Sequence, residues 1–270
     1  LRLSVGDLFM AAVFPGLLLS ALYAVFIVGA ALLRPDLAPR RADARAATDW
    51  RVIGKLLRAL APPTFLMIAV LGSIFMGIAS PTEASGIGAF GATVLAALDR
   101  QLNWKTLREV CYATAKTSAF LYALIFGANC FSVVLRGYGG DQMIEQALHG
   151  MPLSREGVLI LLLAVIFLLG FILDWMEIVL IVAPLTVPII VSMGFDPIWV
   201  AMLIAVCLQT SFLTPPVGIA IFYVKNAAPP EVTTGQIYRG IMPFVILQIL
   251  ALAAVWFFPQ LALWLPRAAY

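Results

Sequence analysis

The chain has 270 residues, of which 63% are hydrophobic and 11% charged, with a mean hydropathy of +1.02 and a formal net charge of +3. An average soluble domain carries roughly 25% charged residues, so this composition excludes an ordinary soluble protein. The basic residues lie in polar connections and form no basic stripe, which excludes a nucleic-acid-binding surface. The long apolar runs suit helices and not the ~10-residue alternating strands of a transmembrane barrel. We therefore predict an all-α polytopic membrane protein, with the lipid bilayer as its surroundings.

The first part of the chain is predicted to contain one membrane span and one basic linker. Residues 1–33 form the span, and residues 34–58 carry seven of the 17 basic residues. A second basic stretch follows at 99–116. Positive charge is concentrated in cytoplasmic loops, so both stretches are expected in the cytoplasm.

Residues 59–135 are predicted to form further apolar helices. Two arms, 59–79 and 84–98, begin this region, and they are either two full spans or a re-entrant hairpin. Their junction fits a helix N-terminus, with Ser80 as N-cap and Glu83 three residues later. The alternative gives Glu83 a part in gating or substrate contact. Pro62-Pro63 is expected in the first turn of its helix.

A polar connection, 136–156, leads to a second pair of arms, 157–173 and 178–193. Each arm is short for a span, and the junction between them places Asp174 and Glu177 beside apolar residues. One interpretation is an ordinary loop at the headgroup level. The other is a helical hairpin whose tip, beginning at Gly170, meets a later helix break at membrane depth, because carboxylates there persist mainly with partners or water.

That break is predicted from Pro215-Pro216, which interrupt an apolar run extending from Met202 to Tyr223. Two adjacent prolines remove two backbone donors, so a continuous helix cannot pass through them. Hydrocarbon cannot satisfy the released carbonyls, and such breaks are found where they line ion or substrate sites in secondary transporters. Residues 227–270 are then expected to form a polar loop and one last span, from 240 to about 266.

Three ordered motifs resemble the large membrane subunit (DctM-like, M-subunit) of tripartite ATP-independent periplasmic (TRAP) transporters. They are Gly77-Ile78-Ala79-Ser80-Pro81-Thr82-Glu83-Ala84, Gly170-Phe171-Ile172-Leu173-Asp174 and Leu213-Thr214-Pro215-Pro216-Val217-Gly218. The resemblance covers nearly the whole chain and corresponds to the C-terminal half of a full-length family member, so we expect a fragment.

The resemblance implies a multi-pass protein of the bacterial inner membrane, built as one inverted-repeat half of an elevator-type fold. Residues 59–135 would be scaffold-type helices, and 157–226 the transport-type hairpin and broken helix. The family imports organic acids with Na+, together with a periplasmic substrate-binding protein and a small membrane subunit. No nucleic acid partner and no enzymatic activity are expected.

Carried onto this chain, the resemblance implies a sodium site formed by Gly170, Ser211, Thr214 and Val217. The family often has glycine at the position of Ser211. The expected supporting residues are Asp174, Pro215, Pro216, Gly218, Thr82 and Glu83. No arginine is placed by its sequence position alone to clamp a carboxylate.

Two alternatives compete with this hypothesis. One is another secondary ion or anion transporter of the same superfamily. The other is an intramembrane lipid-modifying enzyme, which needs acid/base or metal-binding residues clustered at one interface. The sequence contains neither HExxH nor Gly-x-Ser-x-Gly, so no catalytic motif supports the enzyme.

Overall fold

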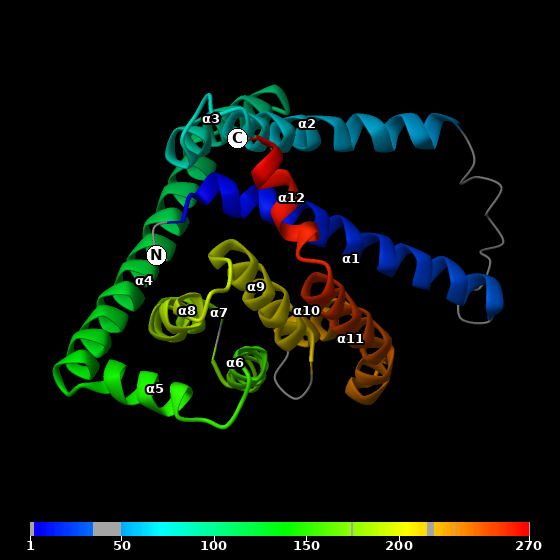
Figure 1. Ribbon diagram of the computed structural model, residues 1–270. Helices are drawn as coiled ribbons and strands as arrows, with labels where there is room; N and C mark the ends of the chain where they lie inside the picture. Colours follow the sequence, from blue (N-terminus) through cyan, green and yellow to red (C-terminus); the bar gives the residue numbers. More distant parts are fainter. Residues whose placement is uncertain (1–2, 35–49, 174, 215–218, 230, 270) are drawn as a thin grey trace. The chain divides into compact units, whose positions relative to one another are not determined.

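The computed structural model describes residues 3–34, 50–173, 175–214, 219–229 and 231–269, and these are helical throughout, with turns between helices (Figure 1). The elements in chain order are α1 Val5–Leu33, α2 Trp50–Phe75, α3 Pro81–Leu98, α4 Trp104–Gly137, α5 Gly140–His149, α6 Arg155–Leu169, α7 Trp175–Glu177, the π-helix η3 Ile178–Val182, α8 Ala183–Ser192, α9 Pro197–Leu213, α10 Ile219–Ala227, α11 Thr234–Phe257 and α12 Gln260–Ala269.

Five of these helical segments are long and apolar enough to cross a membrane. They are Val5–Leu33, Gly54–Phe75, Trp104–Gly137, Trp175–Ser192 and Thr234–Phe257. The prediction of an all-α polytopic membrane protein is confirmed. The chain divides into two compact units: unit 1 comprises Leu1–Tyr23 and Ala119–Tyr270, and unit 2 comprises Ala24–Ser118. The division falls inside residues 59–135, which the sequence had placed in one group.

Unit 2 contains a hairpin of two packed helices, α2 and α3. A Cβ on Gly91 would lie 2.4 Å from Leu66 Cδ1, so the two helices approach closely there. The turn between them ends in the predicted capping box, in which the backbone N–H of Ser80 donates to Glu83 Oε2 at 2.8 Å and Glu83 N–H donates to Ser80 Oγ at 3.3 Å. The capping role predicted for Ser80 and Glu83 is therefore confirmed.

Several helix boundaries differ from the prediction. Helix α2 begins at Trp50, inside the expected linker 34–58, and places Pro62 and Pro63 in its interior and not in its first turn. Arginine and lysine are good helix formers, so a basic stretch that continues an amphipathic pattern extends the helix and does not end it.

The same reason applies to α4, which begins at Trp104 inside the expected basic stretch 99–116. The connection 136–156 contains α5. The last span is interrupted: α11 ends at Phe257, and α12 starts at Gln260 after Pro259, which has no N–H to continue the helix.

In unit 1, α9 is the central element and packs against α6, α8, α10, α11 and α12 (Figure 1). Its buried residues, among them Val200, Leu203 and Cys207, form the main apolar cluster with α6 residues such as Leu159 and Ile166. Two polar contacts fix the neighbours of α9 in register. Cys207 Sγ lies 3.3 Å from the Leu163 carbonyl oxygen of α6, and the Trp199 indole N–H donates to the Val255 carbonyl of α11 at 2.9 Å.

The second arm of the predicted hairpin consists of α7, η3 and α8 in direct succession. The wide π-turn lies just before Pro184, the second residue of α8. Proline lacks an N–H and its ring clashes with the preceding turn, which explains a local change of helix type at this point.

Candidate functional site

Helices α6 and α9 start at the same level of unit 1. Ser154 caps α6, since Gly157 N–H donates to its hydroxyl at 3.2 Å. Asp196 caps α9 by accepting the N–H groups of Ile198 and Trp199 at 2.9 and 3.3 Å. The Arg155 guanidinium lies 5.5 Å from the centre of the Phe195 ring, which ties the two helix starts together.

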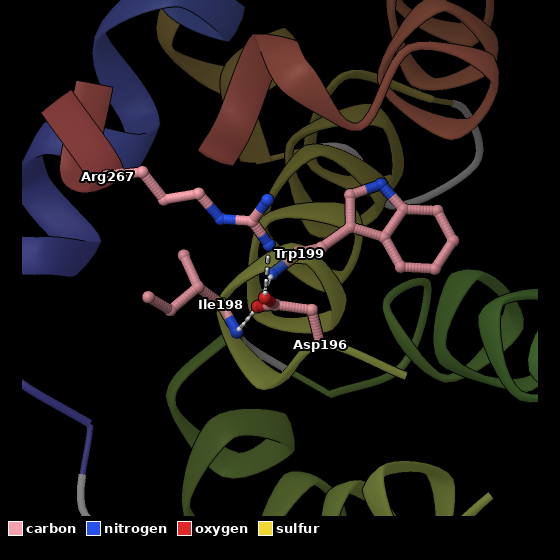
Figure 2. Close-up of polar contacts among 4 residues, drawn as sticks. All are labelled: Asp196, Ile198, Trp199 and Arg267. Carbon is pink, nitrogen blue, oxygen red and sulfur yellow. Dashed lines mark hydrogen bonds and ion pairs between the residues drawn. The ribbon is translucent and has the colours of Figure 1, made fainter. Parts of the chain in front are cut away.

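Arg267 of α12 also contacts the start of α9. Figure 2 shows the Arg267 guanidinium of α12 reaching the Asp196 carboxylate, where Nη2 and Oδ2 are 3.1 Å apart. One carboxylate therefore caps α9 with Oδ1 and binds α12 with Oδ2.

From this common level, α6 and α9 run side by side in the same direction. Gly170 at the end of α6 lies 15 residues beyond Arg155, the first residue of α6, and Ser211 near the end of α9 lies 14 residues beyond Pro197, the first residue of α9. At 1.5 Å per residue this is about 21–22 Å along each helix. This length is shorter than the roughly 30 Å hydrocarbon layer of a bilayer.

The contact between Gly170 and Ser211 is very close. A Cβ on Gly170 would lie 2.2 Å from Ser211 Oγ and 2.6 Å from Ser211 Cβ. Only glycine allows this approach. The hairpin tip thus meets the last turn of α9, as the sequence predicted.

The last turn of α9 ends at Thr214, whose extended backbone, φ −86° and ψ 132°, stops the helix. Its N–H donates to the Ser211 carbonyl at 3.2 Å, and its hydroxyl donates to the Thr210 carbonyl at 2.7 Å. The next helix, α10, begins at Ile219. The predicted interruption of this apolar run is therefore present.

The hydroxyls of this turn all donate to carbonyls of α9. Thr210 Oγ1 donates to Val206 at 2.9 Å, and Ser211 Oγ donates to Leu208 at 2.8 Å. Because a hydroxyl oxygen that donates still has lone pairs, each remains able to coordinate a cation. The carbonyl ends of α6 and α9 converge here, and a helix C-terminus carries partial negative charge. The arrangement favours a small cation.

The predicted site residues have different outcomes in the structure. Gly170, Ser211 and Thr214 come together, and Ser211 is 2% exposed. Val217, Asp174, Pro215, Pro216 and Gly218 lie outside the described residues. Thr82 and Glu83 belong to unit 2. In the part of the chain that the structure describes, no three His, Cys, Asp or Glu side chains are grouped to hold a metal. The oxygens that the described residues offer there are carbonyls and hydroxyls.

A cavity of about 850 Å³ adjoins this region within unit 1. Its walls are largely apolar and come from Leu3, α1, α7, η3, α8 and α9, with Gln209 and Phe212 at the α9 end. The Arg136 side chain, at the end of α4, also lines it. The sequence had singled out no arginine, because only the tertiary fold brings the end of α4 beside α8 and α9.

Gln248 was also not expected from the sequence to lie at the site. It is a polar residue in the middle of α11 and is 3% exposed. An isolated glutamine inside an apolar span could have indicated it, since such side chains form hydrogen bonds between membrane helices.

Comparison with known proteins identifies the family of the chain. The sequence model of the family "Tripartite ATP-independent periplasmic transporter, DctM component" matches residues 1–261, and the chain belongs to this family. The chain is 30% identical to the C4-dicarboxylate TRAP transporter large permease protein DctM of Pseudomonas aeruginosa, over 98% of the chain and 60% of the relative.

Two further relatives carry other names. The chain is 28% identical to the ectoine TRAP transporter large permease protein TeaC of Halomonas elongata, over 99% of the chain and 61% of the relative. It is 26% identical to the sialic acid TRAP transporter large permease protein SiaM of Vibrio cholerae, over 98% of the chain and 60% of the relative. The chain thus spans about 60% of the length of these relatives.

Proposed function

We propose that this chain forms the C-terminal half of the membrane permease of a sodium-coupled TRAP transporter that imports organic acids across the bacterial inner membrane. The observation that carries the proposal is the meeting of Gly170 and Ser211, where the carbonyl ends of α6 and α9 converge. Broken transporter helices use such C-terminal ends and unwound carbonyls to bind Na+.

In this proposal Na+ is bound by carbonyl oxygens at Gly170, Ser211 and Val217 and by an oxygen of Thr214. Neutral ligands suit the site because they bind a cation without leaving a buried net charge when the ion departs. Pro215, Pro216 and Gly218 would keep the break open, with Asp174 stabilising the hairpin. Residues 157–226 would be the moving, transport-type part.

The substrate class rests on the family and on the cavity. Relatives are named for a C4-dicarboxylate and for sialic acid, and both are acids. The cavity beside α8 and α9 offers one cationic side chain, Arg136, next to mostly apolar walls, and such a combination suits a carboxylate on a carbon skeleton. A periplasmic substrate-binding protein would deliver the acid, and a small membrane subunit would complete the permease.

The test is uptake by proteoliposomes that contain the complete permease with its small membrane subunit. Radiolabelled succinate and a sialic acid serve as probes, each supplied with the corresponding binding protein. We expect uptake driven by an inward sodium gradient and abolished when potassium replaces sodium. Equal uptake with potassium would reject sodium coupling. Uptake that needs no binding protein would favour another transporter of the same superfamily.

A further inference from the structure

The buried polar side chains of the described residues gather in one place. Those with a buried polar side chain are Thr210, Ser211 and Gln248, at 1, 2 and 3% exposure. The first two belong to the last turn of α9. Gln248 comes from α11, a different helix, yet it faces the same turn.

Gln248 lies within the apolar seam by which α11 packs in unit 1. The other buried residues of that seam are Ile237, Ile241, Val245, Ala251 and Val255, and together with Gln248 they are spaced three or four residues apart. Gln248 occupies the position where this pattern calls for an apolar side chain. A buried polar group in such a seam costs free energy unless it is hydrogen-bonded, so its partners indicate its role.

One partner is the Tyr23 side chain of α1, and another is the backbone of the proposed sodium site. Gln248 Nε2 donates to the Gln209 carbonyl oxygen at 3.4 Å. That carbonyl is the one an α-helix pairs with Leu213, the last residue of α9. The other amide atom, Gln248 Oε1, is buried and has no hydrogen-bond partner among the described residues. An apolar residue would avoid that cost, so packing alone does not explain the glutamine.

The last turn of α9 needs support from outside. The helix stops at Leu213, so no further helical turn follows it, and its last carbonyls at Thr210 and Ser211 are paired with Thr214. Helix α11, in contrast, runs unbroken from Thr234 to Phe257 beside it. A hydrogen bond from α11 can therefore fix the orientation of the turn that ends at Thr214.

We propose that Gln248 is a positioning residue for the sodium site: its amide holds the Gln209 carbonyl and so keeps the Thr210–Thr214 turn in ion-binding geometry. The inference rests on the proposed function and deepens it, since Gln248 acts through α9 and does not itself bind the ion. It predicts that removing the amide lowers the affinity for sodium, and that this loss is larger than the loss in stability of the folded protein.

The molecule supplies a matched control in Trp199. Its indole N–H makes the other polar contact between α9 and α11, to the Val255 carbonyl. Trp199 lies twelve residues before Ser211, about 18 Å along α9. The substitution Trp199→Phe removes this donor and keeps an aromatic ring, so it perturbs the same helix pair far from the site.

The experiment is a sodium titration of the thermal unfolding midpoint of the complete purified permease, with KCl replacing NaCl at constant ionic strength. A ligand that binds only the folded state raises the midpoint with its concentration, so each titration yields a half-saturating sodium concentration without any organic substrate. For Gln248→Met, which has a similar length and no donor, we expect this concentration to rise about threefold to tenfold, the range for one lost hydrogen bond. For Trp199→Phe we expect a lower midpoint in KCl and an unchanged sodium dependence.

In Gln248→Asn, whose side chain is shorter by one methylene, the half-saturating sodium concentration should rise as well. This variant is the test if Gln248→Met does not fold. Equal half-saturating concentrations in the parent and the Gln248 variants would overturn the inference, and so would equal shifts in the Gln248 and Trp199 variants. If the parent itself shows no sodium-dependent stabilisation, the sodium site fails, and the inference fails with it.

Discussion

Gly170 and Ser211 lie so close that a single added methyl group on Gly170 would overlap the Ser211 side chain, at 2.2 Å from Oγ and 2.6 Å from Cβ. The contact joins the tip of the hairpin to the last turn of α9. Because both residues are at helix ends, the distance between them sets how closely the two sets of carbonyls converge.

The first prediction follows from this contact. Gly170→Ala should destabilise the protein by about 1–3 kcal/mol, the usual cost of overpacking, and should weaken sodium-dependent uptake. Ser211→Gly removes the atoms that clash, so the double variant should recover most of both losses. The check is a double-mutant cycle on the thermal midpoint and on uptake. Additive losses in the double variant would show that the two residues are not in contact.

This contact also shows what the sequence could and could not predict. The break at Pro215-Pro216 and the cap at Ser80 were predictable because each depends on a few adjacent residues. The meeting of the hairpin tip with the break was expected because two short apolar arms with a polar junction favour a hairpin. These features depend on local chemistry and on the demands of the bilayer.

Other features depend on tertiary packing and had no local signal. The early start of α2 at Trp50 is one example, since a basic stretch can be a linker or the exposed part of a helix. The placement of Arg136 in a cavity wall is another. The contact between Gln248 and Gln209 joins residues 39 positions apart: an isolated glutamine in an apolar span marks Gln248 as unusual, but neither segment alone indicates its partner.

A second prediction concerns Asp196, which caps α9 and binds Arg267. Loss of an N-cap costs about 0.5–2 kcal/mol, whereas a partly exposed ion pair contributes about 0–1 kcal/mol. Asp196→Ala should therefore lower the thermal midpoint more than Arg267→Gln, and Asp196→Asn, which can still cap, should match Arg267→Gln. A larger effect for Arg267→Gln than for Asp196→Ala would show that the ion pair and not the cap is the dominant contribution.

A third prediction uses the exposed capping box of α3. The Ser80 backbone N–H and then its hydroxyl hold the pKa of Glu83 below its usual value of 4.5. A lowered folded-state pKa means that the contribution of this carboxylate to stability is present above the unfolded-state pKa and is lost as the pH falls through the folded-state value. NMR titration of ¹³C-labelled glutamate should detect the lowered pKa. In Ser80→Ala the pKa should rise only part of the way, because the backbone donor remains, and an unchanged value would show that the hydroxyl has no effect.

A fourth prediction addresses the cavity. If Arg136 faces the carboxylate of the substrate, Arg136→Gln should raise the KM for the organic acid about tenfold or more, since a charged hydrogen bond contributes about 1.5–3 kcal/mol. The half-saturating sodium concentration in the thermal titration should stay at the parent value, because that assay contains no organic acid. Arg136→Lys should recover part of the affinity. Parent-like KM values for Arg136→Gln would remove Arg136 from the substrate site.

The central claim is that the break after α9 binds the coupling ion, and Thr214 is the side chain that tests it most directly. Thr214 combines a backbone that ends the helix with a hydroxyl only 2.7 Å from the Thr210 carbonyl oxygen. In the complete permease, the decisive measurement is the sodium dependence of organic acid uptake by Thr214→Ala, with Thr214→Ser as the control that keeps the hydroxyl. We predict a half-saturating sodium concentration raised at least about tenfold in Thr214→Ala, with a similar amount of folded protein and near-parental behaviour in Thr214→Ser. Sodium activation of Thr214→Ala equal to that of the parent would contradict the sodium site.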